Sequence, residues 1–328
     1  MIMVASGGEE IERLRVHYLG KKGILAEIAA EIPKLPPEDK AEIGEVFNDV
    51  KQAISNALGA AQTNIPAINS TTTVDTSLPG VKPPLGHLHP VTKAIEEISS
   101  IFEKIGFVRV RYPEVDWDWY AFESLNMPKS HPARDDIETF FVDAPENSRY
   151  GKMVLTPQTS NGQVREMERL KAPPIRMINI AKCYRRQSDV SHTAMFHQFE
   201  GLCINSDINI TNLKGTIDYF SQQFFGPERK TRLRPNHFQF TEPSFEVDVI
   251  CDICLGKGCR LCKEGWLELG GAGMVHPNVL KAGKIDTTKY SGFAFGWGVE
   301  RTYMMKSGIK IDDLRLLYSN DIRFLTQF

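Results

Sequence analysis

Four of the six cysteines of the chain lie close together, in the stretch CDICLGKGCRLC (251–262). Cys251 and Cys254 form one CxxC pair, and Cys259 and Cys262 form a second. Two such pairs in a tight turn have the spacing of a four-thiolate tetrahedral site, for which Zn²⁺ is favoured and iron is the alternative. Because four thiolates leave no open coordination position, we expect a structural metal. The alternative to a metal site is a reduced, metal-free turn.

The composition is that of an ordinary globular protein. The 328 residues are 41% hydrophobic and 24% charged, with a net charge of −2, and this length accommodates one large domain and a smaller one. No apolar run approaches the ~20 residues of a membrane span, and the N-terminus lacks a signal-peptide pattern, so a cytoplasmic protein with no membrane contact is expected. The near-neutral charge limits RNA contacts to basic patches at 13–23, 182–186 and 228–234, and each patch has the alternative of being merely solvated surface.

The sequence pattern divides the chain into three parts. Residues 1–65 are expected to form an N-terminal helical hairpin arm, because apolar residues over 43–61 recur every three or four positions. Residues 66–86 are rich in Thr, Ser, Pro and Gly without periodicity, which is typical of a linker. A larger domain is expected over 87–328, with the cysteine cluster as a small insert at 250–265.

The larger domain contains one strongly amphipathic helical pattern over 90–105, ended by Gly106. Its isoleucine stripe would face either a partner subunit or the domain's own sheet. A second helix is expected over 211–225. Because strands follow strands with helices inserted between some of them, the expected fold class is α+β, an antiparallel sheet flanked by helices. The strand-like runs are 107–115, 153–156, 175–184, 196–205, 245–250, 265–275 and 292–298.

Three stretches of this domain stand in the order of the signature motifs of class II aminoacyl-tRNA synthetases. The first is the helix–strand unit that ends at Pro113, and the second is CYRRQSDVSHTAMFHQFEG (183–201). The third is GFAFGWGVERTYMM (292–305), a glycine-rich strand that leads into Glu300 and Arg301. Any one of these patterns arises by chance, but the three in this order resemble the class II catalytic core.

More detailed matches narrow the resemblance to bacterial phenylalanyl-tRNA synthetase α subunits. It implies ATP-dependent activation of L-phenylalanine to phenylalanyl-adenylate and transfer to tRNA(Phe) by the domain over 87–328. It also implies a β subunit as partner, in an α₂β₂ heterotetramer. The matching segments are HPARD (131–135), FHQFEG (196–201), FTEPSFEVDV (240–249), GAGMVHPNVL (271–280) and YSGFAFGWGVER (290–301).

The resemblance assigns the catalytic and ATP-binding side chains to the second and third motifs. Arg185 would clamp the α-phosphate, since a planar guanidinium fork matches two phosphate oxygens. Arg301 would contact the distal phosphates or stack near the adenine, and His192 matches a histidine near the phosphates. The remaining residues expected at this site are Gln187, Phe196 and, as a ligand of the Mg²⁺ that accompanies ATP, Glu242.

The implied amino-acid site joins an apolar slot to a polar group at one end. Phe238 and Phe240 match two phenylalanines that pack on the substrate ring, and alternation along a strand would put both rings on one face. Ala294 matches the small residue at the floor of the slot. The residues expected around the substrate's ammonium group and backbone are Thr159, Ser160, Gln163, Gln198, Glu200 and Gly296.

Two positions depart from the family pattern. Gln158 stands where a histidine is common, and Gln187 stands where an acidic residue commonly follows the second-motif arginine. Both changes bear on the fine geometry of the site rather than on the class of reaction. The alternatives to the enzyme are a non-catalytic RNA- or protein-binding module on the same fold and an adenylating paralogue that uses no tRNA. A phosphate clamp and an amino-acid slot in one chain favour the enzyme.

Overall fold

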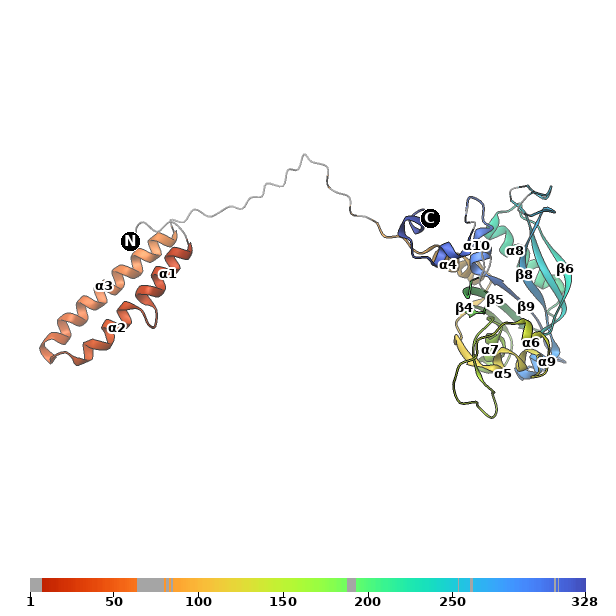
Figure 1. The fold of residues 1–328 in the computed structure, drawn as a ribbon, viewed down its shortest axis with the longest axis horizontal. Coiled ribbons are helices and arrows are strands. Elements are labelled where there is room, and N and C mark those ends of the chain that lie inside the picture. The colour runs from red at the N-terminus through yellow and green to blue at the C-terminus, as the bar shows by residue number, and fades with distance from the viewer. Residues whose placement is uncertain are drawn as a thin grey trace. The chain divides into compact units, whose positions relative to one another are not determined.

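The computed structural model describes residues 8–63, 80, 83, 85–187, 193–252, 254–259, 262–309, 311 and 313–328. The chain divides into two compact units, Met1–Pro83 and Pro84–Phe328 (Figure 1). The linker expected over 66–86 lies mostly outside the described residues, so its limits stay a prediction. Within the described residues, no helix combines the length and the apolar character that a membrane crossing requires.

The N-terminal unit consists of helices. Figure 1 shows α1 and α2 in succession beside the longer α3. Gly20 follows the end of α1, and a side chain there would meet the carbonyl oxygen of Val16 at 2.3 Å. Ile11, Leu25 and Leu58 are buried between the helices. The elements are α1 (Gly8–Leu19), α2 (Ile24–Glu31), the 3₁₀ turn η2 (Ile32–Lys34) and α3 (Pro37–Thr63).

The C-terminal unit is built on a seven-stranded sheet with the order β1-β4-β5-β9-β8-β7-β6. Every neighbouring pair is antiparallel except β1 and β4, which are parallel. A separate two-stranded sheet pairs β2 with β3. The expected α+β class is therefore confirmed. The strands are β1 (Val108–Val110), β2 (Val115–Trp117), β3 (Met153–Leu155), β4 (Ile175–Tyr184), β5 (Met195–Asn205), β6 (Thr231–Phe238), β7 (Thr241–Ile250), β8 (Trp266–Val275) and β9 (Ser291–Gly298).

One face of the large sheet is covered by α4 (Pro90–Glu103) and α8 (Ile210–Phe225). Phe102 of α4 is fully buried, and its ring centre lies 5.1 Å from that of Phe220 and 5.3 Å from that of Phe295. Burial of such a ring contributes about 1.5–3 kcal/mol, so the isoleucine-rich stripe of α4 stabilises its own sheet.

The opposite face of the sheet carries the second core. Along β9, Phe293 and Phe295 belong to the first core, whereas Ala294 belongs to the second, as the alternation of a strand requires. The first turns of α7 (Asn161–Leu170) and the segment from Tyr120 to Met127 pack on this second face. The remaining helices are α5 (Asp118–Ala121), η3 (Glu123–Leu125), α6 (Ala133–Asp136), α7 (Asn161–Leu170), α9 (Pro277–Ala282), α10 (Val299–Met304), η4 (Leu314–Tyr318) and α11 (Ile322–Leu325).

Candidate active site and metal centre

A cavity of about 180 Å³ opens at the second face of the sheet. Of the predicted amino-acid-binding residues, all except Thr159 line it. Thr159 lies directly behind the cavity wall, where its hydroxyl donates to the Glu200 carboxylate at 3.2 Å. The predicted lining residues are Ser160, Gln163, Gln198, Glu200, Phe238, Phe240, Ala294 and Gly296; the others are Gln158, Thr241, Gly271, Ala272 and Phe295.

The two predicted phenylalanines form one wall of this cavity. Their ring centres lie 5.9 Å apart and their planes differ by 15°. The expectation that they alternate along one strand is wrong, because β6 ends at Phe238 and β7 begins at Thr241, which leaves Phe240 in the connecting turn. The hairpin turn, rather than strand alternation, brings both rings to the same cavity.

Glycine and alanine keep the floor of the cavity open. Ala294 is only 3% exposed. A side chain at Gly296 would meet the Gln198 amide nitrogen at 2.6 Å and the Glu200 carboxylate at 3.4 Å. A side chain at Gly271 would meet the ring of Phe238 at 2.9 Å. These small residues therefore leave room for an aromatic ligand on the sheet surface.

A buried carboxylate closes the polar end of the cavity. Glu200 is 2% exposed. Its oxygens accept hydrogen bonds from the Ser160 hydroxyl at 2.5 Å and from the Gln163 amide at 2.7 Å. These donors come from the start of α7, which the second core holds against the sheet. The Gln163 carbonyl oxygen is buried with no hydrogen-bond partner among the described residues, so it remains as an acceptor at the cavity wall.

The electrostatics of Glu200 suit a cationic ligand. Burial raises the pKa of Glu200 to about 7, although the hydrogen bonds from Ser160, Gln163 and Thr159 act in the opposite direction. The partners of the carboxylate are neutral hydroxyl and amide groups. An ammonium group in the cavity would stabilise the ionised form and supply the missing positive charge.

The predicted nucleotide-binding residues in the described part of the chain lie just after β4, at the start of β5 and in α10. The Arg185 guanidinium lies 4.6 Å from the centre of the Phe196 ring, so two predicted ATP-binding residues are in contact. Arg301, in α10, lies 3.9 Å from the Glu268 carboxylate and is half-exposed. Gln187 is exposed on the loop after β4. His192 lies outside the described residues, so its role stays a prediction.

A buried glutamate, Glu300, joins the second and third motifs. Glu300, immediately before Arg301, is 3% exposed. Its carboxylate accepts a hydrogen bond from the backbone N–H of His197 at 2.7 Å. His197 immediately follows Phe196. The start of α10, with Arg301, is therefore tied directly to the strand that carries Phe196.

The predicted magnesium ligand Glu242 lies elsewhere. It borders a second cavity of about 530 Å³, its side chain is 74% exposed, and its carboxylate lies 3.2 Å from His276 Nε2. On β7, Glu242 is about 20 Å from Asp248, the residue level with Glu268 on β8. The structure therefore does not bring Glu242 to the predicted phosphate-binding arginines, and its role as a magnesium ligand stays a prediction.

Sequence reasoning missed Glu268, which does lie beside one of the predicted arginines, Arg301. Its carboxylate is 3.9 Å from Arg301 and 3.7 Å from Arg234, a residue of β6. Arg234 also pairs with Asp248 at 2.6 Å. The signal for Glu268 was an acidic residue inside an otherwise apolar strand, GWLELGG, next to the glycine-rich segment. Strand pairing was needed to place it opposite the third motif.

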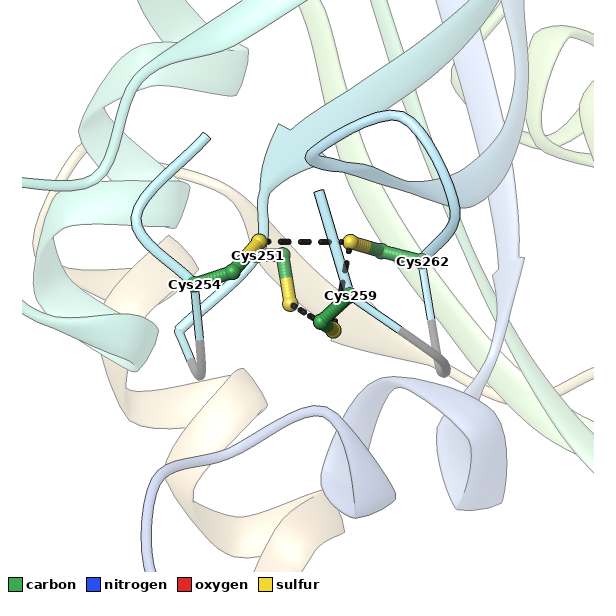
Figure 2. Close-up of side chains that lie close together, drawn as sticks. All are labelled: Cys251, Cys254, Cys259 and Cys262. Carbon is green, nitrogen blue, oxygen red and sulfur yellow. Dashed lines mark hydrogen bonds between the residues drawn. The ribbon is translucent and has the colours of Figure 1, made fainter. Parts of the chain in front are cut away.

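The four clustered cysteines converge in the connection between β7 and β8. Figure 2 shows Cys251, Cys254, Cys259 and Cys262 pointing toward a common centre, and their sulfur atoms all lie within 4.8 Å of one another. Ligands at ~2.3 Å in tetrahedral geometry place sulfurs about 3.8 Å apart, which agrees with observed separations of 3.3–3.9 Å. The Gly265 N–H donates to Cys262 Sγ at 3.2 Å, a contact that favours a thiolate. The cluster fits a four-coordinate metal ion.

The backbone around the cysteines has the geometry of two tight turns. Gly256 and Gly258 have φ values of +88° and +90°, which L-residues with side chains rarely adopt. Arg229, itself buried, donates to the carbonyl oxygen of Ile250 at 2.7 Å and pairs with Asp252. The hairpin is thus anchored to the body of the domain at the end of β7.

Comparisons with known proteins identify the family of the chain. A family profile described as "tRNA synthetases class II core domain (F)" matches residues 73–328. A second, "Aminoacyl tRNA synthetase class II, N-terminal domain", matches residues 7–70. A protein named "Phenylalanine--tRNA ligase alpha subunit" from Pseudomonas fluorescens (strain SBW25) is 45% identical over 97% of this chain and 93% of its own length. The same name belongs to a protein of Pelotomaculum thermopropionicum, 44% identical over 98% of this chain and 93% of its own length.

The chain belongs to the phenylalanine–tRNA ligase α-subunit family. A family member from Francisella tularensis subsp. holarctica (strain OSU18) is 46% identical, again over 97% of this chain and 93% of its own length. Among solved structures, pyrrolysyl-tRNA synthetase from Desulfitobacterium hafniense has a TM-score of 0.52 and covers 86% of this chain and 85% of that one. Its sequence identity is 17%, so this likeness concerns the fold alone.

One departure from the family pattern lies in the described site. Gln158 lines the cavity, and its amide nitrogen is 3.5 Å from the carbonyl oxygen of Ala121. At this distance the hydrogen bond is weak, so the side chain is free to present its own carbonyl or amide to a ligand. A phenylalanine–tRNA ligase α subunit with glutamine here lacks a titratable group at this position.

Proposed function

We propose that this chain is the catalytic α subunit of a phenylalanine–tRNA ligase. It would activate L-phenylalanine with ATP to phenylalanyl-adenylate and pyrophosphate, and then transfer the amino acid to tRNA(Phe). The observation that carries the proposal is a cavity with an aromatic slot and a buried carboxylate, Glu200, together with the Arg185 guanidinium, which contacts Phe196 on the same strand as Glu200. These are the groups that the ring, the ammonium group and the reacting phosphate of such a substrate pair require, in that order.

Substrate binding follows from the two ends of the cavity. The phenyl ring would enter the slot beside Phe238 and Phe240, above the floor made by Ala294, where aromatic pairs add ~0.5–1.5 kcal/mol beyond area burial. The ammonium group would pair with Glu200 and with the unpaired carbonyl oxygen of Gln163. This arrangement leaves the substrate carboxylate directed away from the slot, toward Arg185.

Activation would depend on positioning and charge neutralisation. The substrate carboxylate oxygen attacks the α-phosphorus of ATP, the bond to the β-phosphate oxygen breaks, and pyrophosphate leaves. Arg185 and Arg301 would stabilise the negative charge on the phosphates, and Phe196 would offer a stacking surface. Mg²⁺, when bound with ATP, supplies further charge neutralisation, and Glu268 is the carboxylate best situated to hold it. No protein nucleophile is needed.

The two alternative functions fit the site less well. A module that only binds RNA or protein would not need a buried carboxylate at the end of an aromatic slot. A tRNA-independent adenylating paralogue would use the same pocket, but the match of the synthetase N-terminal domain profile to residues 7–70 favours the ligase subunit. A β subunit, an α₂β₂ assembly and a cytoplasmic location are parts of this proposal that come from the family. The division of the chain into an arm over 1–65, a linker over 66–86 and a catalytic domain over 87–328 is also part of this proposal.

We also assign a structural Zn²⁺ to the cysteine cluster. The cluster lies in the connection between β7 and β8, outside the lining of the amino-acid cavity. Four sulfur ligands leave no position for water or substrate, so the ion would hold the hairpin rather than act in the reaction.

The decisive test is phenylalanine-dependent ATP–pyrophosphate exchange, measured for the chain with and without a co-expressed β subunit, followed by charging of tRNA(Phe). Exchange and charging by the assembly support the ligase. Exchange without charging would favour the paralogue, and the absence of exchange in both preparations would favour a binding module.

A further inference from the structure

The hairpin that carries both slot phenylalanines is held by contacts from several segments. Within the hairpin, the Ser244 hydroxyl accepts a hydrogen bond from the Phe238 backbone N–H at 3.1 Å. From the residue that caps the start of α9, the His276 backbone N–H donates to the carbonyl oxygen of Phe240 at 3.0 Å. The turn residue between the two phenylalanines, Gln239, is bound by a third segment.

That third contact comes from Asn126. Its side-chain amide nitrogen donates to the carbonyl oxygen of Gln239 at 2.8 Å. Its side-chain oxygen accepts a hydrogen bond from the Asn278 amide nitrogen at 2.9 Å. Asn126 therefore links the turn at 239–240 to the first turn of α9. It borders the second cavity and does not line the amino-acid cavity, so it would not touch the substrate.

The chemistry of this link has a defined direction. A backbone carbonyl can only accept, so the amide nitrogen of Asn126 must face Gln239, and its oxygen is then left for Asn278. The backbone of Asn126 has φ +64°, a left-handed conformation in which asparagine and aspartate are the most tolerated non-glycine residues. The position thus combines a backbone requirement with a side chain that both donates and accepts.

We propose that Asn126 is a positioning residue for amino-acid selection, which holds the 239–240 turn so that Phe238 and Phe240 keep the spacing of the aromatic slot. This inference rests on the proposed function. A turn released from Asn126 would let the two rings separate, which weakens contact with the phenyl ring of the substrate and admits larger or more polar rings. Arg301, a predicted nucleotide-binding residue, lies beside Glu268, at the opposite end of β8 from the Thr241–Val275 pair next to this turn, and would be unaffected.

The test is Asn126→Asp in the chain co-expressed with its β subunit. Aspartate has the same shape, tolerates the same backbone conformation and still accepts from Asn278, but it cannot donate to Gln239 and places two acceptors in contact. We expect the KM for phenylalanine in pyrophosphate exchange to rise about tenfold and the preference for phenylalanine over tyrosine to fall. The KM for ATP should stay within about twofold of wild type.

Two further variants make the outcome interpretable. Asn278→Ala removes only the outer bond from an exposed position, so it should shift the phenylalanine KM in the same direction by a smaller factor. Asn320→Asp changes another asparagine of positive φ, on the exposed C-terminal segment, and should behave as wild type. Wild-type values for Asn126→Asp, or an equal rise in both KM values, would overturn the inference while leaving the ligase function intact. An inactive wild-type assembly would instead overturn the proposed function together with this inference.

Discussion

Glu300 and His197 connect the two motifs that would hold ATP. One oxygen of the buried Glu300 carboxylate lies 2.7 Å from the His197 backbone nitrogen and 2.9 Å from its Nδ1. The Tyr318 hydroxyl donates to the same oxygen, and burial together with the Glu300 charge raises the pKa of Tyr318, which keeps this donor protonated. Arg301 and Phe196 flank this pair in the sequence, so their separation depends on it.

We therefore expect Glu300→Gln to impair ATP use. The glutamine oxygen can still accept a bond, but the uncharged amide loses the stronger charge-assisted interaction with its donors, worth about 1.5–3 kcal/mol. The kcat/KM for ATP in pyrophosphate exchange should fall about 10- to 100-fold, whereas the affinity for phenylalanine, measured by calorimetry, should be nearly unchanged. Equal losses for both substrates would indicate a general collapse of the site.

Phenylalanine binding should depend on pH through Glu200. Its pKa is raised to about 7 by burial, so the carboxylate is increasingly protonated below pH 7 and loses its attraction for an ammonium group. The Kd for phenylalanine should become constant above about pH 8, rise about fivefold from about pH 7 to about pH 6, and approach a tenfold rise per pH unit below that. Titration calorimetry between pH 5.5 and about 8 would measure this, and Glu200→Gln should bind weakly with no such pH dependence.

The Glu200 carboxylate should also affect the free energy of unfolding. This free energy should be highest at low pH, whereas phenylalanine binding should be strongest at high pH. The ordinary pKa of a glutamate is 4.5, and the folded value is about 7, so the folded state holds the extra proton between these values. The free energy of unfolding should therefore fall as pH rises from 4.5 to about 7, by about 3 kcal/mol in total. Glu200→Gln should be more stable than wild type at pH 8, and chemical unfolding at both ends of the range would reveal it.

Ala294→Gly should enlarge the floor of the slot. Removing one methyl group from a residue that is 3% exposed and lines the cavity creates space opposite the para position of the ring. We expect kcat/KM for para-chlorophenylalanine to rise at least about tenfold, with the KM for ATP unchanged. No gain for the substituted substrate would show that Ala294 does not form the floor.

The magnesium ligand can be assigned by comparing two glutamates. Glu268 lies beside Arg301, whereas Glu242 lies beside His276. Glu242 is at the start of β7, and Asp248, the residue level with Glu268, is near the end of that strand. We expect Glu268→Gln to raise the Mg²⁺ concentration needed for half-maximal exchange by about tenfold, because a carboxylate ligand is replaced by a neutral one. Glu242→Gln is the matched comparison, and a larger effect there would restore the assignment made from sequence.

The cysteine cluster should hold one metal ion per chain. Metal analysis of the purified protein by mass spectrometry should give zinc in the wild type and none in a Cys254→Ser/Cys259→Ser double variant. Cys203→Ala, which changes a buried cysteine outside the cluster, should retain the ion. Chelation should lower the unfolding temperature. Immediate loss of activity with an intact fold and intact phenylalanine binding would contradict a purely structural role.

Long elements with many regularly spaced apolar residues could be predicted well from the sequence. The helix expected over 90–105 is α4 (Pro90–Glu103), and the strand expected over 175–184 is β4 with the same limits. Both have many apolar residues in a regular period and clear ends, such as Pro90 and Gly106. The cysteine spacing likewise predicted a convergent cluster, because a short loop allows few other arrangements.

Elements of mixed composition were harder to predict. The basic segment over 228–234 largely belongs to β6, where Arg232 and Arg234 pair with Asp248 of the next strand. This strand, TRLRPNHF, has only two large apolar side chains, Leu233 and Phe238, and it contains a proline, so the local sequence gave no strand pattern. The run over 107–115 divides into β1 and β2, since Pro113 interrupts it and the two parts join different sheets.

The sequence by itself determined the chemical types at this site, namely the slot phenylalanines, the glutamate at the end of the slot and the arginines predicted to bind phosphate. Only the tertiary structure decided which of these groups meet. Phe240 reaches the slot from a turn, Glu268 reaches Arg301 through strand pairing, and Asn126 reaches Gln239 from a distant segment. The physical reason is that residue types follow from local chemistry, whereas such contacts depend on strand register and on the packing of segments far apart in the chain.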